Sequence, residues 1–128
     1  MRLNQVTVTV AEVDAAIAFY QTLGLKLIVK SPHYARFKCP RGEGTFSVHL
    51  GAAPKCPSTV VYFENENLDA VVKELQAAGL VFDAEPADQR WLWREARLRD
   101  PSGNPICLFH AGENRLNPPW RLPATETT

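Results

Sequence analysis

The segment Trp91–Arg97 carries side chains that could hold a small molecule. In a strand, successive side chains point to opposite faces, and this alternation places Trp93, Glu95 and Arg97 on one face. Trp91 falls on the same face. An indole beside a carboxylate and a guanidinium forms an apolar wall with two charged groups at its edge. Glu95 is therefore a candidate general base and Arg97 a candidate anchor for a ligand carboxylate or phosphate, with a purely structural ion pair between them as the alternative.

A second set of candidates lies on two strands of the N-terminal half. The first ten residues alternate valine with polar residues, which places Gln5 and Thr7 on the polar face of a strand. A later strand alternates in the same way and places Ser47 and His49 on a polar face. His49 could act as a metal ligand or general base, or it could be a hydrogen-bonded strand histidine.

Two further candidates lie in the C-terminal half. Tyr62 falls on a predicted strand and could line a cavity or pack in the core. Cys107 lies in an apolar strand, where a buried thiol is a more common role than a nucleophile or metal ligand. The opposite face of segment 91–98, which carries Leu92, is expected to pack against a helix.

The elements that must position these residues occur in the same order twice. Each half reads as a strand, an amphipathic helix and three further strands. The motif Val13-Asp14-Ala15 corresponds to Leu68-Asp69-Ala70, and Leu23-Gly24-Leu25 corresponds to Ala78-Gly79-Leu80 at the same offset. The predicted strands cover residues 1–10, 25–29, 34–39, 45–50, 59–64, 80–84, 91–98 and 105–110, and the predicted helices cover 14–23 and 68–79.

This repeat predicts one domain made of two modules. Module 1 covers about residues 1–51 and module 2 about residues 58–110, with a linker of proline and small residues at 52–57. Residues 111–128 form a polar, proline-rich tail, which we expect to be either a strap or a disordered end.

Composition narrows the functional classes. The chain has 128 residues, enough for one domain with a real core, and its 14 basic residues equal its 14 acidic ones. A balanced charge disfavours nucleic-acid binding, and the sequence predicts no membrane span. Three cysteines form an odd, sparse set, so we expect reduced thiols and a cytoplasmic protein.

Three short motifs then follow one another in a characteristic order. They are residues 6–24 with Phe19-Tyr20 and Leu23-Gly24, residues 68–79, and the turn Asp100-Pro101-Ser102-Gly103-Asn104. Together with the repeat, they resemble the vicinal oxygen chelate superfamily of glyoxalases, bleomycin-resistance proteins and dioxygenases. The resemblance implies an α+β fold of two βαβββ modules in one chain, with a curled mixed sheet around a central cup. The polar strand faces described above would look into that cup.

The resemblance also implies positions for a divalent metal such as Zn²⁺, Ni²⁺ or Mn²⁺. Metal-dependent members place ligands on the first and last strand of each module, which here gives Gln5, His49, Val60 and Cys107. Valine cannot coordinate a metal, and a thiol stands where glutamate is expected. Gln5, His49 and Cys107 are an incomplete set, which could hold Zn²⁺ only with water completing the shell.

Three functions are consistent with this resemblance. The first is binding of a small organic ligand in the cup without a complete metal site, against Trp93 and Tyr62 and with polar contacts from Gln5, His49, Glu95 and Arg97. The second is a metal-dependent lyase, isomerase or dioxygenase in which Glu95 moves a proton. The third is an interaction module whose cup is filled by its own side chains. Family members of this size commonly form homodimers, so a homodimer is also expected.

Overall fold

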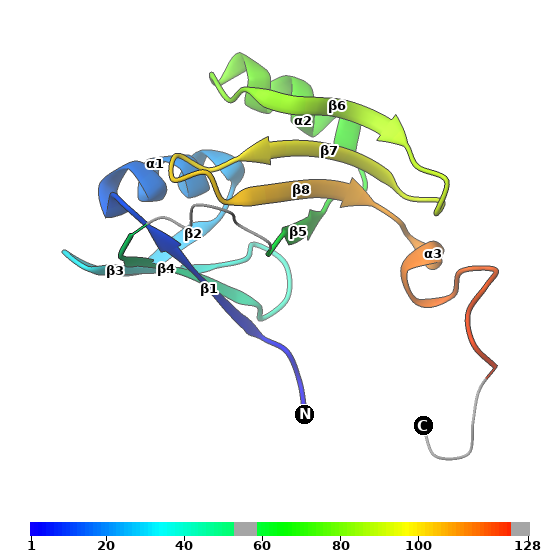
Figure 1. Cartoon of the computed structure of the whole chain (residues 1–128), viewed down its shortest axis with the longest axis horizontal. Coiled ribbons are helices and arrows are strands. Elements are labelled where there is room, and N and C mark those ends of the chain that lie inside the picture. Colours follow the sequence, from blue (N-terminus) through cyan, green and yellow to red (C-terminus); the bar gives the residue numbers. More distant parts are fainter. Residues whose placement is uncertain (53–58, 124–128) are drawn as a thin grey trace.

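The chain folds as two successive modules with the same order of elements (Figure 1). The structure is a computed structural model that describes residues 1–52 and 59–123. Module 1 contains β1 (Gln5–Val10), α1 (Val13–Leu23), β2 (Lys26–Ser31), β3 (Tyr34–Lys38) and β4 (Thr45–Leu50). Module 2 contains β5 (Val61–Glu64), α2 (Leu68–Ala77), β6 (Phe82–Asp88), β7 (Arg94–Arg99) and β8 (Pro105–His110), and α3 (Glu113–Leu116) follows. The predicted βαβββ repeat is confirmed.

Each module forms its own four-stranded mixed sheet. The strand orders are β1-β4-β3-β2 and β5-β8-β7-β6. In both sheets the first strand of the module pairs in parallel with the last, and the remaining pairs are antiparallel. The two sheets and their helices confirm the predicted α+β fold class.

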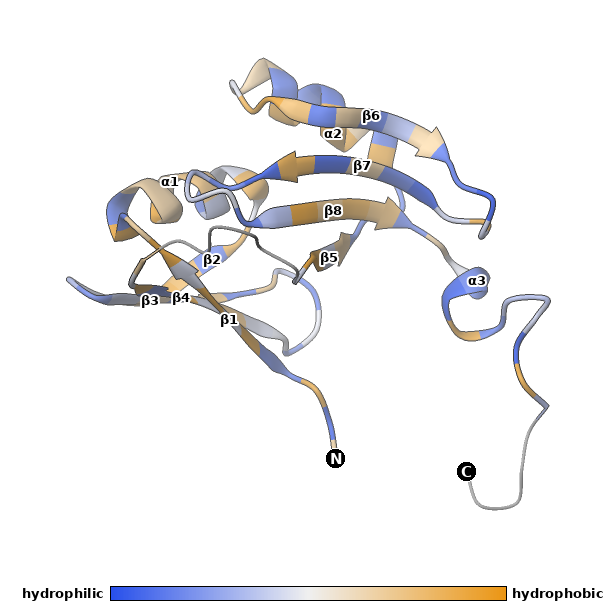
Figure 2. Ribbon diagram, viewed as in Figure 1, coloured by the Kyte–Doolittle hydropathy of each residue, from blue (hydrophilic) through white to orange (hydrophobic). Residues whose placement is uncertain are grey.

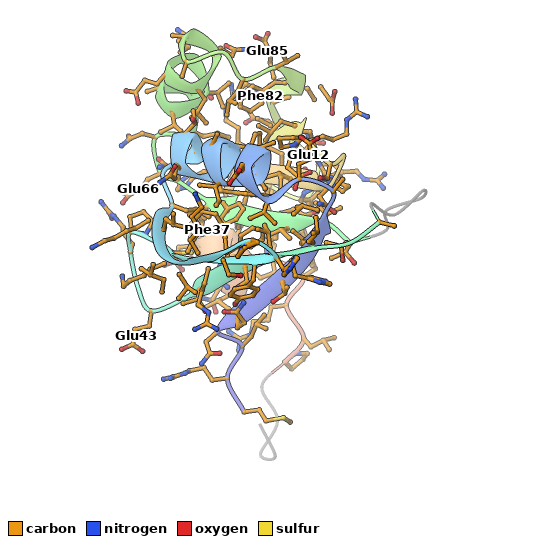
Figure 3. All side chains as sticks on the ribbon, turned by 90° about the vertical axis from the view of Figure 1, so that its left-hand side faces the viewer. Glu12, Phe37, Glu43, Glu66, Phe82 and Glu85 are labelled. Carbon is orange, nitrogen blue, oxygen red and sulfur yellow. The ribbon has the colours of Figure 1, made fainter. Side chains whose placement is uncertain are left out.

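The two modules share one hydrophobic core. One face of each sheet, together with both helices, contributes to a single cluster of buried residues. Aromatic rings of both modules contact one another in this core. The ring centroid of Phe46 in module 1 lies 4.6 Å from that of Tyr20 in the same module and 5.7 Å from that of Phe63 in module 2. Figure 2 shows the middle of β8 as a hydrophobic band, and Figure 3 shows Phe37 on the side of the first sheet that faces α1. None of the helices in the described parts of the chain is long and apolar enough to cross a membrane.

The turn between β7 and β8 fastens the modules together. Asp100, which is buried, accepts a hydrogen bond from the Tyr20 hydroxyl on α1 at 2.7 Å. The same carboxylate accepts the amides of Ser102 and Asn104 and the Asn104 side-chain amide. Asn104 also donates to the carbonyl of Thr9, so the turn predicted from the sequence joins the end of β1 to module 2.

The structure differs from the predicted elements at the start of β7. We expected a strand from residue 91, but Trp91 and Leu92 lie in a turn. Leu92 has a φ of 69° and its side chain is 46% exposed, so it does not pack against a helix as expected. The turn is closed by a hydrogen bond from the Leu92 amide to the Gln89 carbonyl, a local contact that hydrophobic alternation does not reveal. The predicted linker at 52–57 lies outside the described residues apart from Ala52.

The described part of the tail is attached to β5. One oxygen of Glu64 accepts the backbone amides of Ala111 at 2.7 Å and Gly112 at 3.1 Å. Trp93 donates its indole N–H to the carbonyl of Asn114 at 3.2 Å. Residues 111–117, including α3, therefore form the strap that was one of the two predicted alternatives. Residues 124–128 lie outside the described range.

Candidate functional site

The candidate residues divide between two surfaces, one on each module. Each surface is the side of its sheet that faces away from the shared core, because side chains alternate along every strand. We define the module-1 face by Gln5, Thr7, Thr9, Tyr34, Arg36, Lys38, Thr45, Ser47 and His49. We define the module-2 face by Val60, Tyr62, Trp93, Glu95, Arg97, Cys107 and Phe109. Among the described residues, no hydrogen bond, ion pair or ring contact joins one face to the other.

An aromatic cluster forms the wall of the module-2 face. Trp93 stacks on Phe109 with ring centroids 4.8 Å apart. Tyr62 meets both rings edge-on, at 6.0 Å from Trp93 and 5.6 Å from Phe109. Stacked and edge-on geometries are the favourable ones for aromatic pairs. Tyr62 remains 43% exposed, so the wall offers an open aromatic edge to solvent.

A buried carboxylate lies beside this wall. Glu95 is 4% exposed and accepts the Trp91 indole N–H at 2.8 Å and an Arg97 N–H at 3.0 Å. Although Trp91 lies in a turn and not in the predicted strand, its indole still points to Glu95. Arg97 also reaches the Tyr62 hydroxyl at 3.4 Å, and its guanidinium lies 5.6 Å from the centre of that ring. The predicted grouping of Trp93, Glu95, Arg97 and Tyr62 is present in the structure.

Cys107 lies on the module-2 face beneath these side chains. Its side chain is fully buried, and its thiol is 3.7 Å from the carbonyl of Leu108. Burial, together with the negative charge of Glu95, raises the pKa of the Cys107 thiol to about 12. A thiol with this pKa stays protonated near neutral pH, which disfavours both nucleophilic attack and metal binding.

The module-1 face is polar and hydrogen-bonded within itself. Gln5 donates to the hydroxyl of Ser47 at 2.7 Å and to that of Thr7 at 3.1 Å. His49 contacts a different residue, since its Nε2 lies 3.0 Å from the hydroxyl of Thr9. Gln5 is paired with Thr45, so His49 lies four residues further along β4, about 13 Å away at the rise of a strand.

These placements test whether one chain could hold the metal that the resemblance implies. Gln5 and His49 are too far apart along the strands to share an ion directly, and Cys107 belongs to the other face. The fourth position, Val60, packs against the cluster around Cys107 and Phe109. The described residues also contain no group of three His, Cys, Asp or Glu side chains that could hold a metal. The predicted ligands therefore do not fit a metal within one chain.

Sequence reasoning missed the three residues that β3 contributes to the module-1 face, Tyr34, Arg36 and Lys38. Arg36 donates from Nε to the hydroxyl of Tyr34 at 2.9 Å, and that hydroxyl lies 2.6 Å from the hydroxyl of Ser47. The hydrogen bond with Ser47, reinforced by Arg36, lowers the pKa of the Tyr34 phenol. The signal was available, because Tyr34 and Arg36 alternate along β3 as Glu95 and Arg97 do along β7.

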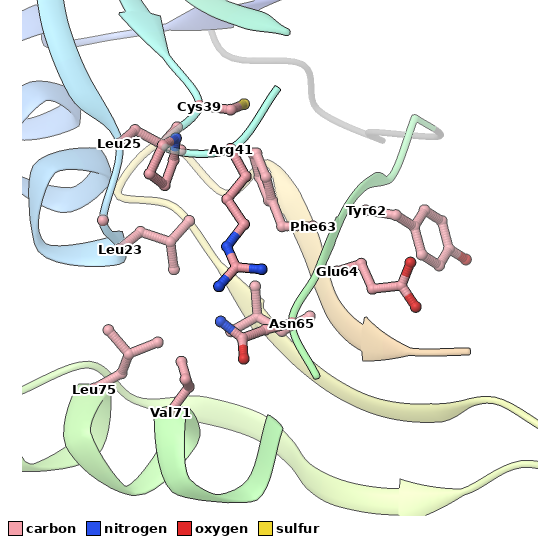
Figure 4. A pocket seen from close by; sticks show the side chains of 13 residues that line it. Leu23, Leu25, Cys39, Arg41, Tyr62, Phe63, Glu64, Asn65, Val71 and Leu75 are labelled. Atoms are coloured by element: carbon pink, nitrogen blue, oxygen red, sulfur yellow. The ribbon is translucent and has the colours of Figure 1, made fainter. Parts of the chain in front are cut away.

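A separate cavity lies between the modules on the other side of β5. It has a volume of about 390 Å³, with an apolar floor that includes Leu23, Val71 and Leu75. Figure 4 shows Arg41 directed into it, whereas Tyr62 points to the opposite side of the strand. This cavity contains none of the predicted site residues except the backbone region of Tyr62.

Comparison with known proteins identifies the relationship suggested by the repeat and its motifs. The Glyoxalase/Bleomycin resistance protein/Dioxygenase superfamily matches residues 2–108. The chain belongs to this superfamily. A comparison with curated proteins finds no significant match. The strap beyond residue 108 lies outside the matched range of the superfamily.

Solved structures of the superfamily share the fold at low sequence identity. A glyoxalase/bleomycin resistance protein/dioxygenase from Nocardioides is 21% identical, with a TM-score of 0.78 over 96% of this chain and 90% of its own. A bleomycin-binding protein complexed with bleomycin is 18% identical, with a TM-score of 0.70 over 86% of this chain and 98% of its own. A lactoylglutathione lyase from Agrobacterium tumefaciens is 16% identical, with a TM-score of 0.68 over 85% and 92%. These structures support the superfamily fold and no finer assignment.

Proposed function

We propose that the chain binds a small organic molecule on the module-2 face, without a complete metal site of its own. The observation that carries this proposal is the buried Glu95 carboxylate, held by Trp91 and Arg97 at the foot of a partly exposed aromatic cluster. Burying a carboxylate is costly unless it is hydrogen-bonded, and a few fixed polar groups beside an apolar wall are typical of ligand sites.

Each group would have a defined role toward the ligand. The edge of Tyr62 and the indole of Trp93 would contact an aromatic or apolar part of the molecule. Arg97 is 37% exposed and uses one terminal nitrogen for Glu95 and Tyr62, which leaves its other N–H groups for the ligand. The bleomycin complex of a protein with the same fold supports the use of this scaffold for organic molecules.

Isothermal titration calorimetry with 2-naphthol, a neutral planar probe, tests the proposal. We expect saturable binding to the wild-type chain that is lost in Trp93→Ala and Tyr62→Leu. Trp120→Ala serves as the matched control, because Trp120 is exposed and lies outside the cluster. No binding to the wild type, or equal binding to Trp93→Ala, would overturn the proposal.

A metal-dependent lyase, isomerase or dioxygenase is the second candidate, supported by the shared fold of the lactoylglutathione lyase. It can be tested by elemental analysis of protein purified without an affinity-tag metal. Stoichiometric Zn²⁺, Ni²⁺ or Mn²⁺ that is lost in His49→Ala would favour this candidate. Since the donors of one chain do not meet, such a result would also require ligands from two copies.

We also propose that the chain forms a homodimer that covers its outward faces. Large apolar side chains are exposed on β2 of the first sheet at Ile28 and Val29, and Val29 lies opposite Arg36 of the module-1 face. Ligand sites bury most of the surface of their ligand, and an open sheet face can do so only when a second surface, here that of another copy of the chain, covers it. Sedimentation equilibrium should give twice the chain mass, and a concentration-independent monomer would contradict this proposal.

A further inference from the structure

The module-1 face carries positive charge without a carboxylate to balance it. Arg36 and Lys38 are its two cations, and none of the nine residues that define the face is acidic. Arg36 forms no ion pair with any residue that the structure describes, and its two terminal nitrogens have no hydrogen-bond partner there. A guanidinium with free terminal N–H groups is suited to bind an oxyanion through charge-assisted hydrogen bonds.

The equivalent position of module 2 is neutralised. Arg36 lies opposite Ser47 across the β3–β4 pair. Arg97 lies opposite Cys107 across the β7–β8 pair, so the two arginines hold matching places in the repeat. Arg97 pairs with Glu95, two residues before it, whereas Arg36 has the uncharged Tyr34 in that place. The same position therefore carries a net charge in one module only.

The hydrogen bonds around Tyr34 also leave one proton available. The carbonyl of Val6 lies 3.2 Å from Gln5 Nε2 and fixes the orientation of that amide, so Gln5 donates to Ser47. The Ser47 hydroxyl is buried and lies 2.6 Å from the Tyr34 hydroxyl, a contact in which either oxygen could donate. Because Ser47 already accepts from Gln5 and has no other side-chain partner among the described residues, we assign its proton to the bond with the Tyr34 oxygen. Arg36 donates to the same oxygen. With both acceptor positions used, the Tyr34 hydroxyl has its own proton free to donate.

We propose that Arg36 and Tyr34 form a binding site for an oxyanion, the carboxylate or phosphate group of a small organic anion. The anion accepts an N–H group from the terminal nitrogen of Arg36 on the Nε side, where Tyr34 lies, and the O–H of Tyr34. Lys38 adds a second positive charge on the same strand face. The two hydrogen bonds that Tyr34 accepts make its O–H a stronger donor, which agrees with the lowered pKa of this phenol.

Nuclear magnetic resonance of the arginine Nε–H groups tests the site directly. Sodium acetate and sodium phosphate are titrated at constant ionic strength, with sodium chloride as the balancing salt. We expect the Arg36 signal to shift in a saturable way, with a dissociation constant on the order of millimolar for an anion of so few heavy atoms. The Arg97 signal should shift much less than that of Arg36, because the Glu95 carboxylate beside it already balances its charge. Acetate and phosphate arms show which oxyanion the site prefers.

Variants separate this site from simple charge screening and from the proposed ligand face. Arg36→Gln should abolish the saturable response, and Tyr34→Phe should weaken binding about 5- to 10-fold through loss of one hydrogen bond. Arg41→Gln removes another exposed cation of module 1, one that pairs with Glu66, and it should leave the response intact. An unsaturable shift, or equal shifts of Arg36 and Arg97, would overturn the proposal. Trp93→Ala should not change anion binding, so the two proposals can fail independently.

Discussion

Replacing Tyr20 with phenylalanine tests the contact between α1 and the β7–β8 turn, in which the Tyr20 hydroxyl donates to Asp100 and joins the two modules. Tyr20 is fully buried, and burial next to Asp100 raises the pKa of its phenol far above the usual value, so the group acts as a protonated donor. The substitution removes one hydrogen bond to a charged acceptor and keeps the ring contacts with Phe46 and Phe37. Asp100 retains the three donors from Ser102 and Asn104.

The expected cost follows from this count. A hydrogen bond to a charged group contributes about 1.5–3 kcal/mol, and three remaining donors limit the penalty for Asp100, so we expect a loss of about 2 kcal/mol. For a chain of 128 residues this corresponds to a decrease in Tm of roughly 6–10 °C. Urea unfolding followed by circular dichroism should show a lower midpoint with an unchanged m-value.

Tyr62→Phe is the matched control for this experiment. Its phenol is 43% exposed and reaches Arg97 only at 3.4 Å, so removing it should change the free energy of unfolding by less than about 0.5 kcal/mol. If Tyr20→Phe lowers the free energy of unfolding no more than Tyr62→Phe does, the Tyr20–Asp100 hydrogen bond does not stabilise the contact between the modules. The orientation of both outward faces would then need another explanation.

Three further outcomes are expected. Iodoacetamide should alkylate Cys107 at least about 1,000-fold more slowly in the folded chain than in urea at pH 8, because burial raises the pKa of its thiol from 9.0 to about 12 and keeps the reagent away from it. Mass spectrometry of the labelled peptide measures both rates, and equal rates in the two states would contradict the buried thiol. Glu64→Ala should lower the hydrogen-exchange protection of the Ala111 and Gly112 amides by about tenfold, because both amides donate to the Glu64 carboxylate. Glu64→Gln keeps an acceptor oxygen, so its protection should lie between those of the wild type and Glu64→Ala. Unchanged protection in Glu64→Ala would show that another contact holds the strap. Glu95→Leu should destabilise the chain by about 1–2 kcal/mol, because Arg97 and the Trp91 indole lose their acceptor but are partly exposed and can bind water. Glu85→Leu, at an exposed carboxylate, should change stability little, and similar urea midpoints for the two variants would show that Glu95 does not contribute to stability.

The sequence was sufficient for the fold because its signals are local and repeated. Alternation in β1 and β4 placed Gln5, Thr7, Ser47 and His49 on one side of the sheet, and the structure keeps them there. The matching motifs located both helices. The turn at Trp91 escaped prediction because its closing hydrogen bond and the positive φ of Leu92 leave no trace in a hydrophobic pattern.

The site was harder to predict because it depends on register and orientation. Alternation cannot tell that Gln5 lies beside Ser47 while His49 lies beside Thr9, since only the pairing of β1 with β4 decides this. It also cannot tell that the polar faces of both sheets turn away from a common core. Consequently the candidate residues were found individually, but their division into two separate faces required the structure.

The tryptophan indole N–H signals provide the most direct test of ligand binding on the module-2 face. The chain has three tryptophans, of which Trp91 and Trp93 belong to the site and Trp120 is an exposed reference outside the aromatic cluster. Titration of chelator-treated protein with 2-naphthol should shift the Trp91 and Trp93 signals with one common dissociation constant and leave Trp120 unchanged. Shifts confined to Trp120, or binding that appears only after a divalent metal is restored, would contradict a metal-independent ligand site on this face.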